Sequence, residues 1–177
     1  LLTVINTATY AIITKIIVGT YPFAVITSPD GSRVYVTDYV QNMAVIIDAA
    51  TNSVIAKVPV GNNPTGITIN PDGSKVYVAN AASNTTSVIN TVTNAVIASV
   101  PVGSKSIGLS VTGDGRLVYV TNPNSQTVSV INAQTNTVTA TIPLTLNPGS
   151  FGNFISSGIS CSGTPVTFTI TVNPLSI

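Results

Sequence analysis

The 177-residue chain carries few charges: charged residues make up 6% of it, hydrophobic residues make up 44%, and the formal net charge is +1. Six basic residues spread along the chain cannot form the positive surface that a nucleic-acid backbone requires, so nucleic acid is not an expected partner. No apolar run approaches the roughly 18 residues of a membrane-spanning helix, and Lys15 interrupts the most hydrophobic early stretch. So little net charge favours association between copies.

The side chains that most enzymes use are scarce. His and Glu are absent, and Cys161 is the single cysteine. No His- or Cys-based metal site can be built within one chain, and no His or Glu can act as base beside a hydroxyl or thiol nucleophile. We therefore predict no catalytic residue, no cofactor and no metal. Cys161 is an inert buried thiol, half of an intermolecular disulfide or, as a third reading, a reactive thiol.

In chain order, residues 1–19 match the second half of a repeat, and three full copies follow at 20–61, 62–103 and 104–145. Asp30, Asp72 and Asp114 mark the same Asp-Gly turn in the three copies, about 42 residues apart, a spacing typical of solenoid or propeller repeats. Because the chain opens in the middle of a repeat, we expect that a leader has been removed or that the chain is a fragment.

Each copy predicts four short strands, because Val, Ile, Tyr and Thr are enriched between turn residues. In the second copy the predicted strands are 66–70, 75–80, 86–90 and 95–102. The Asp-Gly pair predicts a tight hairpin between the first two strands. Proline lacks the N–H that a central strand needs, so Pro59, Pro101 and Pro143 predict that the fourth strand forms the outer edge.

One family resembles this pattern closely. Tyr119-Val120-Thr121-Asn122 follows an Asp-Gly turn, and variants occur at 35–38 and 77–80. Residues 1 to about 155 resemble the YVTN-family β-propeller repeats. The resemblance implies an all-β propeller with four-stranded blades and an extracellular setting, since such repeats are known from bacterial and archaeal cell-surface proteins, including surface-layer proteins. The likeness to lactonase-type propellers is more distant, and no catalytic site can be carried over.

The C-terminal part departs from the repeat. Residues 146–155 begin a fourth copy, 156–163 form a Ser/Gly-rich linker, and 164–177 contain one strand with strict alternation. The apolar face of that strand, which we predict to be the assembly strand, consists of Val166, Phe168, Ile170 and Val172. Three arrangements are open: a composite fourth blade closed by both ends of one chain, exchange of the strand with a neighbouring subunit, or a truncated seven-bladed propeller.

The remaining polar and aromatic residues predict mainly structural roles. Asp38 and Asp48 are replaced by Asn in the other copies, which indicates a turn or cap that accepts either side chain. Tyr35, Tyr77 and Tyr119 recur on the second strand and are expected to pack between blades. Tyr39 lies in a loop where it can contact a ligand, and Asn84-Thr85-Thr86 is the one acceptor pattern for N-glycosylation.

Together these features predict a non-catalytic extracellular structural protein, a surface-layer or filament subunit that forms a homo-oligomer or filament through strand pairing or exchange at its termini. The alternative is a propeller binding module that presents loops to a glycan or to a cell-surface protein. A structural subunit is expected to form polymers without a ligand, whereas a binding module is expected to remain monomeric.

Overall fold

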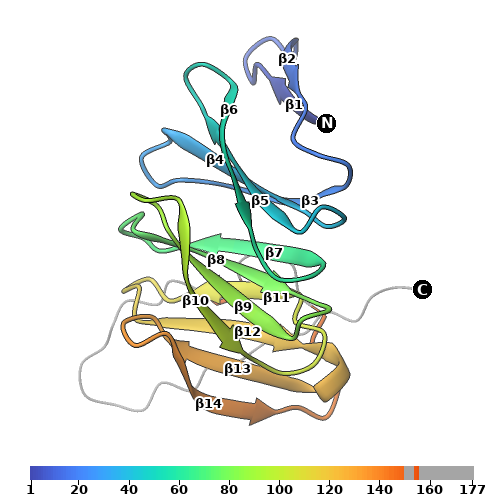
Figure 1. Ribbon diagram of the computed structural model, residues 1–177, viewed down its shortest axis with the longest axis vertical. Coiled ribbons are helices and arrows are strands. Elements are labelled where there is room, and N and C mark those ends of the chain that lie inside the picture. The colour runs from blue at the N-terminus through green and yellow to red at the C-terminus, as the bar shows by residue number, and fades with distance from the viewer. Residues whose placement is uncertain (150–153, 156–177) are drawn as a thin grey trace.

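The computed structural model describes residues 1–149 and 154–155, and this part of the chain is all-β (Figure 1). Apart from the short 3-10 helix η1 (Pro123–Ser125), its regular elements are the strands β1 (Leu2–Ile5), β2 (Ile12–Ile16), β3 (Pro22–Thr27), β4 (Arg33–Asp38), β5 (Met43–Asp48), β6 (Ser53–Pro59), β7 (Pro64–Ile69), β8 (Lys75–Asn80), β9 (Thr85–Asn90), β10 (Ala95–Pro101), β11 (Gly108–Val111), β12 (Leu117–Asn122), β13 (Thr127–Asn132) and β14 (Thr137–Pro143).

The strands form three four-stranded antiparallel sheets and one two-stranded sheet. Blade 1 has the order β3-β4-β5-β6, blade 2 has β7-β8-β9-β10, and blade 3 has β11-β12-β13-β14. The half-blade consists of β1 and β2. Strands β6, β10 and β14 lie at sheet edges and each ends on a proline, so the predicted position of the fourth strand is confirmed.

The Asp-Gly turns have the backbone that the sequence predicted. In blade 1, the Gly31 N–H donates to Ser28 O at 2.9 Å and the Ser28 N–H donates to Arg33 O at 2.9 Å. Gly31 has φ 71°, in the left-handed region where a side chain is strained, and the glycines at the same place in blades 2 and 3 have φ 73°. The hairpin therefore requires glycine for its backbone geometry.

The hydrophobic core lies between the sheets. Tyr35 and Ile46 of blade 1 pack with Val76 and Val78 of blade 2, and Tyr77 of blade 2 packs in the same way against blade 3. Both tyrosines are almost fully buried. Their predicted role between blades is therefore confirmed, whereas Tyr119 of blade 3 is only half-buried.

Two further contacts join successive blades. Arg33 of blade 1 donates to Thr91 O and Asn94 Oδ1 in the β9–β10 turn of blade 2. Lys75 of blade 2 makes the corresponding bonds, to the β13–β14 turn of blade 3. These cation tethers repeat with the blades, so they belong to the architecture and not to a local site.

Several predictions fall outside the described residues. They concern the linker 156–163, the strand 164–177 with Val166, Phe168, Ile170 and Val172, and Cys161. The composite blade is not confirmed. The half-blade and blade 3 lie at opposite ends of the long axis (Figure 1). The Ile155 N–H donates to Ser110 Oγ of β11 at 3.4 Å, so residue 155 lies beside blade 3.

Candidate functional site

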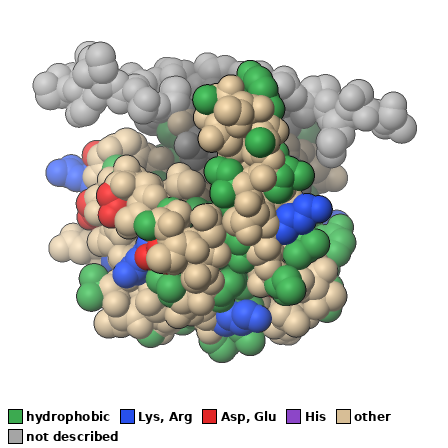
Figure 2. Space-filling view, turned by 90° about the horizontal axis from the view of Figure 1, so that it is seen from above, with side chains coloured by type: hydrophobic (Ala, Val, Ile, Leu, Met, Phe, Trp, Pro, Cys, Tyr) green, Lys and Arg blue, Asp and Glu red, His purple; other side chains and the backbone are tan. Residues whose placement is uncertain are grey.

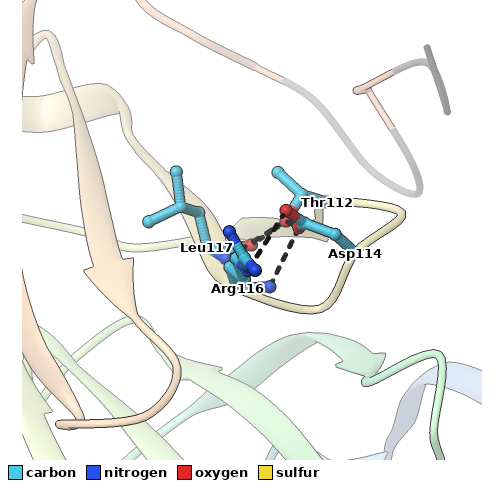
Figure 3. A network of polar contacts seen from close by, with 4 residues as sticks. All are labelled: Thr112, Asp114, Arg116 and Leu117. Carbon is cyan, nitrogen blue, oxygen red and sulfur yellow. Dashed lines mark hydrogen bonds and ion pairs between the residues drawn. The ribbon is translucent and has the colours of Figure 1, made fainter. Parts of the chain in front are cut away.

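The three hairpin aspartates bond within their own turns. In blade 3, Asp114 Oδ1 accepts hydrogen bonds from the Thr112 hydroxyl at 2.5 Å and from the Arg116 N–H at 3.0 Å (Figure 3). In blade 1, the hydroxyl of Ser28, followed by the N–H and hydroxyl of Ser32, lowers the pKa of Asp30 to about 2. Such carboxylates are poor proton acceptors at neutral pH, which fits the structural role that the sequence predicted.

Asp48 caps the turn that follows β5. Its Oδ1 accepts a bond from the Thr51 N–H at 2.8 Å, and Asn90 Oδ1 accepts the corresponding bond from the Thr93 N–H at 2.9 Å. The amide oxygen and the carboxylate oxygen therefore accept the same hydrogen bond in this turn. The prediction that this position accepts either side chain is confirmed by the geometry.

Asp38 is different, because it is fully buried and organises two loops. Its Oδ2 accepts the Thr20 N–H at 2.7 Å, and its Oδ1 accepts the N–H groups of Tyr21, Val40 and Gln41 at 3.1 to 3.2 Å. Burial raises the pKa of Asp38, but these four bonds outweigh it and the net shift is downward. The charged carboxylate thus fixes the loops that lead into β3 and out of β4.

Three aromatic rings cluster on those two loops and on β3. The ring centroids of Phe23 and Tyr39 lie 5.8 Å apart in a stacked arrangement, and Tyr21 lies 5.9 Å from Tyr39 edge-on. Tyr21 is 55% exposed and Phe23 is 39% exposed. The rings form one wall of an open cleft of about 590 Å³, whose lining is Tyr21, Phe23, Tyr39, Val40, Thr65, Ala81, Lys105 and Ile107.

The opposite wall of this cleft comes from blades 2 and 3. Lys105 is the one charged residue among those that line it, and its ammonium has no hydrogen bond or ion pair within residues 1–149 and 154–155. The Lys105 N–H donates to Asn84 Oδ1 at 2.9 Å, which fixes the backbone beneath the ammonium. The sequence had singled out Tyr39 as a ligand contact, and the structure adds Tyr21, Phe23 and Lys105 to it.

A second surface lies on the half-blade. One side of its sheet, with Leu2, Val4 and Ile16, packs against blade 1. The other side, here called the half-blade face, comprises Thr3, Ile5, Ile12, Lys15 and Ile17, all of which are exposed. Figure 2 looks onto this end of the molecule and shows hydrophobic side chains among uncharged polar ones, with charged side chains scattered around them.

Asn84, the candidate glycosylation site, is exposed in the β8–β9 turn and has φ 55°. Its side-chain oxygen is held by Lys105, and Asn42 at the corresponding place in blade 1 accepts the Asn63 N–H at 2.9 Å. The residue therefore has a structural role between blades, and glycosylation at Asn84 stays a prediction.

Two further cavities lie between neighbouring hairpins, with volumes of about 370 and 510 Å³. They are lined by the same turns of successive blades, so they follow from the repeat. No group of three or more His, Cys, Asp or Glu side chains that could hold a metal ion occurs in the described part of the chain. Among the same residues, no helix is long and apolar enough to cross a membrane.

Comparisons with known proteins support the fold. No protein-family model matches the sequence, and no curated protein is significantly similar to it. Among solved structures, hydrazine synthase from Kuenenia stuttgartiensis matches with a TM-score of 0.70 and 28% identity, over 72% of this chain and 37% of that one. The dihydro-heme d1 dehydrogenase NirN in complex with DHE matches with a TM-score of 0.59 and 24% identity, over 71% and 26%.

The chain thus spans about a third of the first structure and about a quarter of the second. Both carry enzyme names, and at these identities the likeness extends to the propeller fold alone. Three antiparallel four-stranded sheets in sequence, packed through their faces, agree with it. The chain is an all-β protein with the β-propeller fold, as the sequence predicted.

Proposed function

We propose that this chain is a non-catalytic structural subunit of an extracellular cell-surface assembly, built from YVTN-type repeats and joined head to tail to further copies of itself. The observation that carries the proposal is the exposure of Ile5. Ile47, Ile89 and Ile131 occupy the corresponding place in blades 1 to 3 and are 1%, 0% and 0% exposed, whereas Ile5 is 52% exposed. In each full blade, the preceding sheet covers this isoleucine. The exposed half-blade face therefore supports contact with the sheet of another blade.

The tether positions support a second copy as the occupant. Within the chain, Arg33 and Lys75 each bind an asparagine in the next blade. In blade 3, the position that corresponds to Arg33 and Lys75 holds Leu117. In the half-blade, the position that corresponds to those asparagines holds Tyr10, which is 83% exposed. Both members of the polar pair are thus replaced by apolar residues. This matched replacement is expected where blade 3 of one copy meets the half-blade of the next.

The positions of the half-blade and blade 3 support contact between copies. The half-blade and blade 3 are at opposite ends of the long axis (Figure 1). A contact between two different surfaces is heterologous, and repetition of it gives a ring or an open filament. In this arrangement the strand with Val166, Phe168, Ile170 and Val172 is donated to the half-blade of the neighbouring copy, where it adds to the open edge of β1.

The non-catalytic part of the proposal is supported by the carboxylates. Asp30, Asp38, Asp48, Asp72 and Asp114 all accept hydrogen bonds in turns, and the pKa of each is lowered, chiefly by hydroxyl and backbone N–H donors. A general acid or base at neutral pH requires a carboxyl pKa shifted in the other direction. These five residues are all the acidic side chains of the chain.

The test is the particle mass and shape of the purified chain, by light scattering and electron microscopy. We expect regular polymers, and we expect Ile5→Lys to reduce them to monomers because a buried unpaired ammonium is costly at the junction. Val92→Lys is the matched control, since Val92 is 84% exposed on the β9–β10 turn and away from the half-blade face. Monomers of 18.1 kDa from the unmodified chain would refute the proposal.

The direction of the contact has its own test. Leu117→Lys places a cation opposite Tyr10 and is expected to weaken assembly. Adding Tyr10→Asn recreates the polar pair that Lys75 and Asn136 form, and we expect it to restore polymers. If the double variant assembles no better than Leu117→Lys alone, blade 3 does not meet the half-blade in this register. Deletion of residues 164–177 separately tests the donated strand.

The alternative of a binding module is favoured by one specific observation, the exposed aromatic cleft beside β3. In a binding module, the loops that lead into β3 and out of β4 would present this cleft to a ligand. A glycan or a cell-surface protein is the partner class that the sequence suggested, and the contacts in the cleft allow a narrower choice.

A further inference from the structure

We propose that the cleft between Tyr39 and Lys105 is a binding site for a small aromatic carboxylate, a ligand with one or two flat rings and one negative charge. This inference does not depend on the proposed assembly, because no residue that lines the cleft belongs to the half-blade face. Its volume of about 590 Å³ is within the range of roughly 300–1,000 Å³ that is usual for small-molecule sites.

The first argument comes from comparing the three blades. The residues that line the cleft occupy positions that correspond between the three repeats, but blade 1 alone has aromatic residues at these positions. Blade 2 has asparagine, threonine and alanine in place of Tyr21, Phe23 and Tyr39, and blade 3 has lysine, isoleucine and proline. The repeat therefore folds without aromatic residues at these positions. Two exposed rings and one half-buried ring in a single blade indicate a local role that the architecture does not require.

The second argument is that the aromatic wall is preformed. Asp38 is buried and binds the backbone N–H groups on both sides of the cluster. The Tyr39 N–H also donates to Tyr21 O at 2.9 Å, which ties the two loops to each other. Fixed loops lower the entropy that a ligand must overcome on binding. Flat rings on a fixed wall favour a flat apolar ligand through stacking and edge contacts.

The third argument is the charge of the opposite wall. Lys105 is the one ionisable side chain that contributes charge at neutral pH to the lining, and it makes no ion pair among the described residues. Asp38 is buried outside the lining, and its carboxylate is bound by four backbone N–H donors. The cleft therefore favours an anion, with the carboxylate at the ammonium and the ring at the aromatic wall.

A saccharide fits this lining less well. Sugar hydroxyls need several hydrogen-bonding side chains. Besides the two tyrosine hydroxyls and the Lys105 ammonium, the cleft offers only Thr65, whose hydroxyl already bonds to Ala79 O at 3.2 Å and to Ser106 O at 3.2 Å. Buried hydroxyls without partners lose affinity. An aromatic carboxylate, in contrast, can stack its ring on the aromatic wall and place its carboxylate at the Lys105 ammonium.

The experiment uses 2-naphthoate as the probe and 2-naphthylmethanol as its neutral counterpart, with binding measured by calorimetry and by saturation-transfer NMR on the full chain. We expect 2-naphthoate to bind more tightly than the alcohol. Lys105→Gln should weaken 2-naphthoate by roughly tenfold, the loss of one charge-assisted bond, and leave the alcohol unchanged. Tyr39→Ala, which inserts the residue that blade 2 carries, should weaken both probes.

The controls are Lys57→Gln and Val92→Ala, which remove an exposed lysine and an exposed apolar side chain elsewhere. Both should leave binding unchanged, and circular dichroism should report the same fold for all four variants. Failure of 2-naphthoate to bind overturns the site, as does binding that persists in Tyr39→Ala. Equal binding of the acid and the alcohol overturns the anion preference, and binding of cello-oligosaccharides in place of 2-naphthoate overturns the ligand class.

Discussion

Replacing Asp38 by asparagine tests how the aromatic wall is built. The same position holds Asn80 in blade 2, where the amide Nδ2 donates to Thr85 Oγ1 at 3.0 Å and to Ser87 Oγ at 2.9 Å. In blade 1 these two hydroxyl residues are replaced by Met43 and Val45. An amide at position 38 therefore has no corresponding acceptor for its N–H groups, although asparagine is the residue that the repeat pattern favours.

The expected cost follows from the bonds that change. Asp38→Asn turns the acceptor of the Thr20 N–H into a donor, which leaves two donors facing each other at a part-buried site, at a cost of about 1–3 kcal/mol. The three bonds to Oδ1 change from charged to neutral, which roughly halves their strength. We expect a loss of about 2–4 kcal/mol in the free energy of unfolding, measured by urea denaturation with circular dichroism detection. Asp48→Asn is the control, with a change within roughly 0.5 kcal/mol.

Two results can refute this reasoning. If Asp38→Asn is as stable as Asp48→Asn at neutral pH, the carboxylate is not what holds the loops. A triple variant that combines Asp38→Asn with Met43→Thr and Val45→Ser rebuilds the hydroxyl acceptors of blade 2 and should recover part of the lost stability.

The pH dependence of stability gives the second check. Because the folded pKa of Asp38 is lowered, its stabilisation is present above the unfolded value of about 3.9 and is lost as pH falls through the folded pKa. The difference between Asp38→Asn and the unmodified chain should therefore shrink in acid.

Three further outcomes are expected. Gly66→Ala puts a Cβ 2.3 Å from Ile107 O, so it should separate blades 2 and 3 locally and lower the urea midpoint, and an unchanged midpoint would contradict the close packing. Ser28→Ala removes the largest cause of the low pKa of Asp30, and carboxyl NMR should show that pKa rising from about 2 toward 3.8. Burial raises the pKa of Tyr77 to about 12, so its stabilisation should be complete below pH 10 and lost as pH rises toward 12, as ultraviolet titration and unfolding can record. Ionisation of Tyr77 near pH 10 in the folded chain would be inconsistent with that burial.

The fold was predictable because its determinants are local and repeated. The Asp-Gly turn, the capping asparagine and the closing proline act within a few residues, and three copies in register make each of them visible in the sequence. Asp38 shows where this fails. Pattern alone treats aspartate and asparagine as equivalent there, but the choice depends on Met43 and Val45 on the neighbouring strand. The residues that decide between aspartate and asparagine lie on a neighbouring strand, so the repeat pattern at position 38 alone does not reveal the choice.

The aromatic cleft was only partly predictable for a similar reason. Tyr39 stood out as irregular, but Phe23 and Lys105 are far from it in sequence and come from other strands and blades. One signal was available: aligning the three copies shows that positions 21, 23 and 39 are aromatic in the first copy and in neither of the others. Differences between internal repeats therefore locate candidate sites that the repeat itself conceals.

The same comparison separates two kinds of junction between blades. Inside the chain, a junction combines an apolar cluster with a cation tether, as between Lys75 and Asn136. At the proposed junction between copies, Leu117 and Tyr10 replace the tether, so this contact depends on apolar burial and strand pairing. Salt screens the charged tethers but strengthens apolar burial when the anion is sulfate. Assembly and folding of this chain should therefore respond differently to salt, with polymers favoured under conditions in which the tethers inside each subunit contribute least.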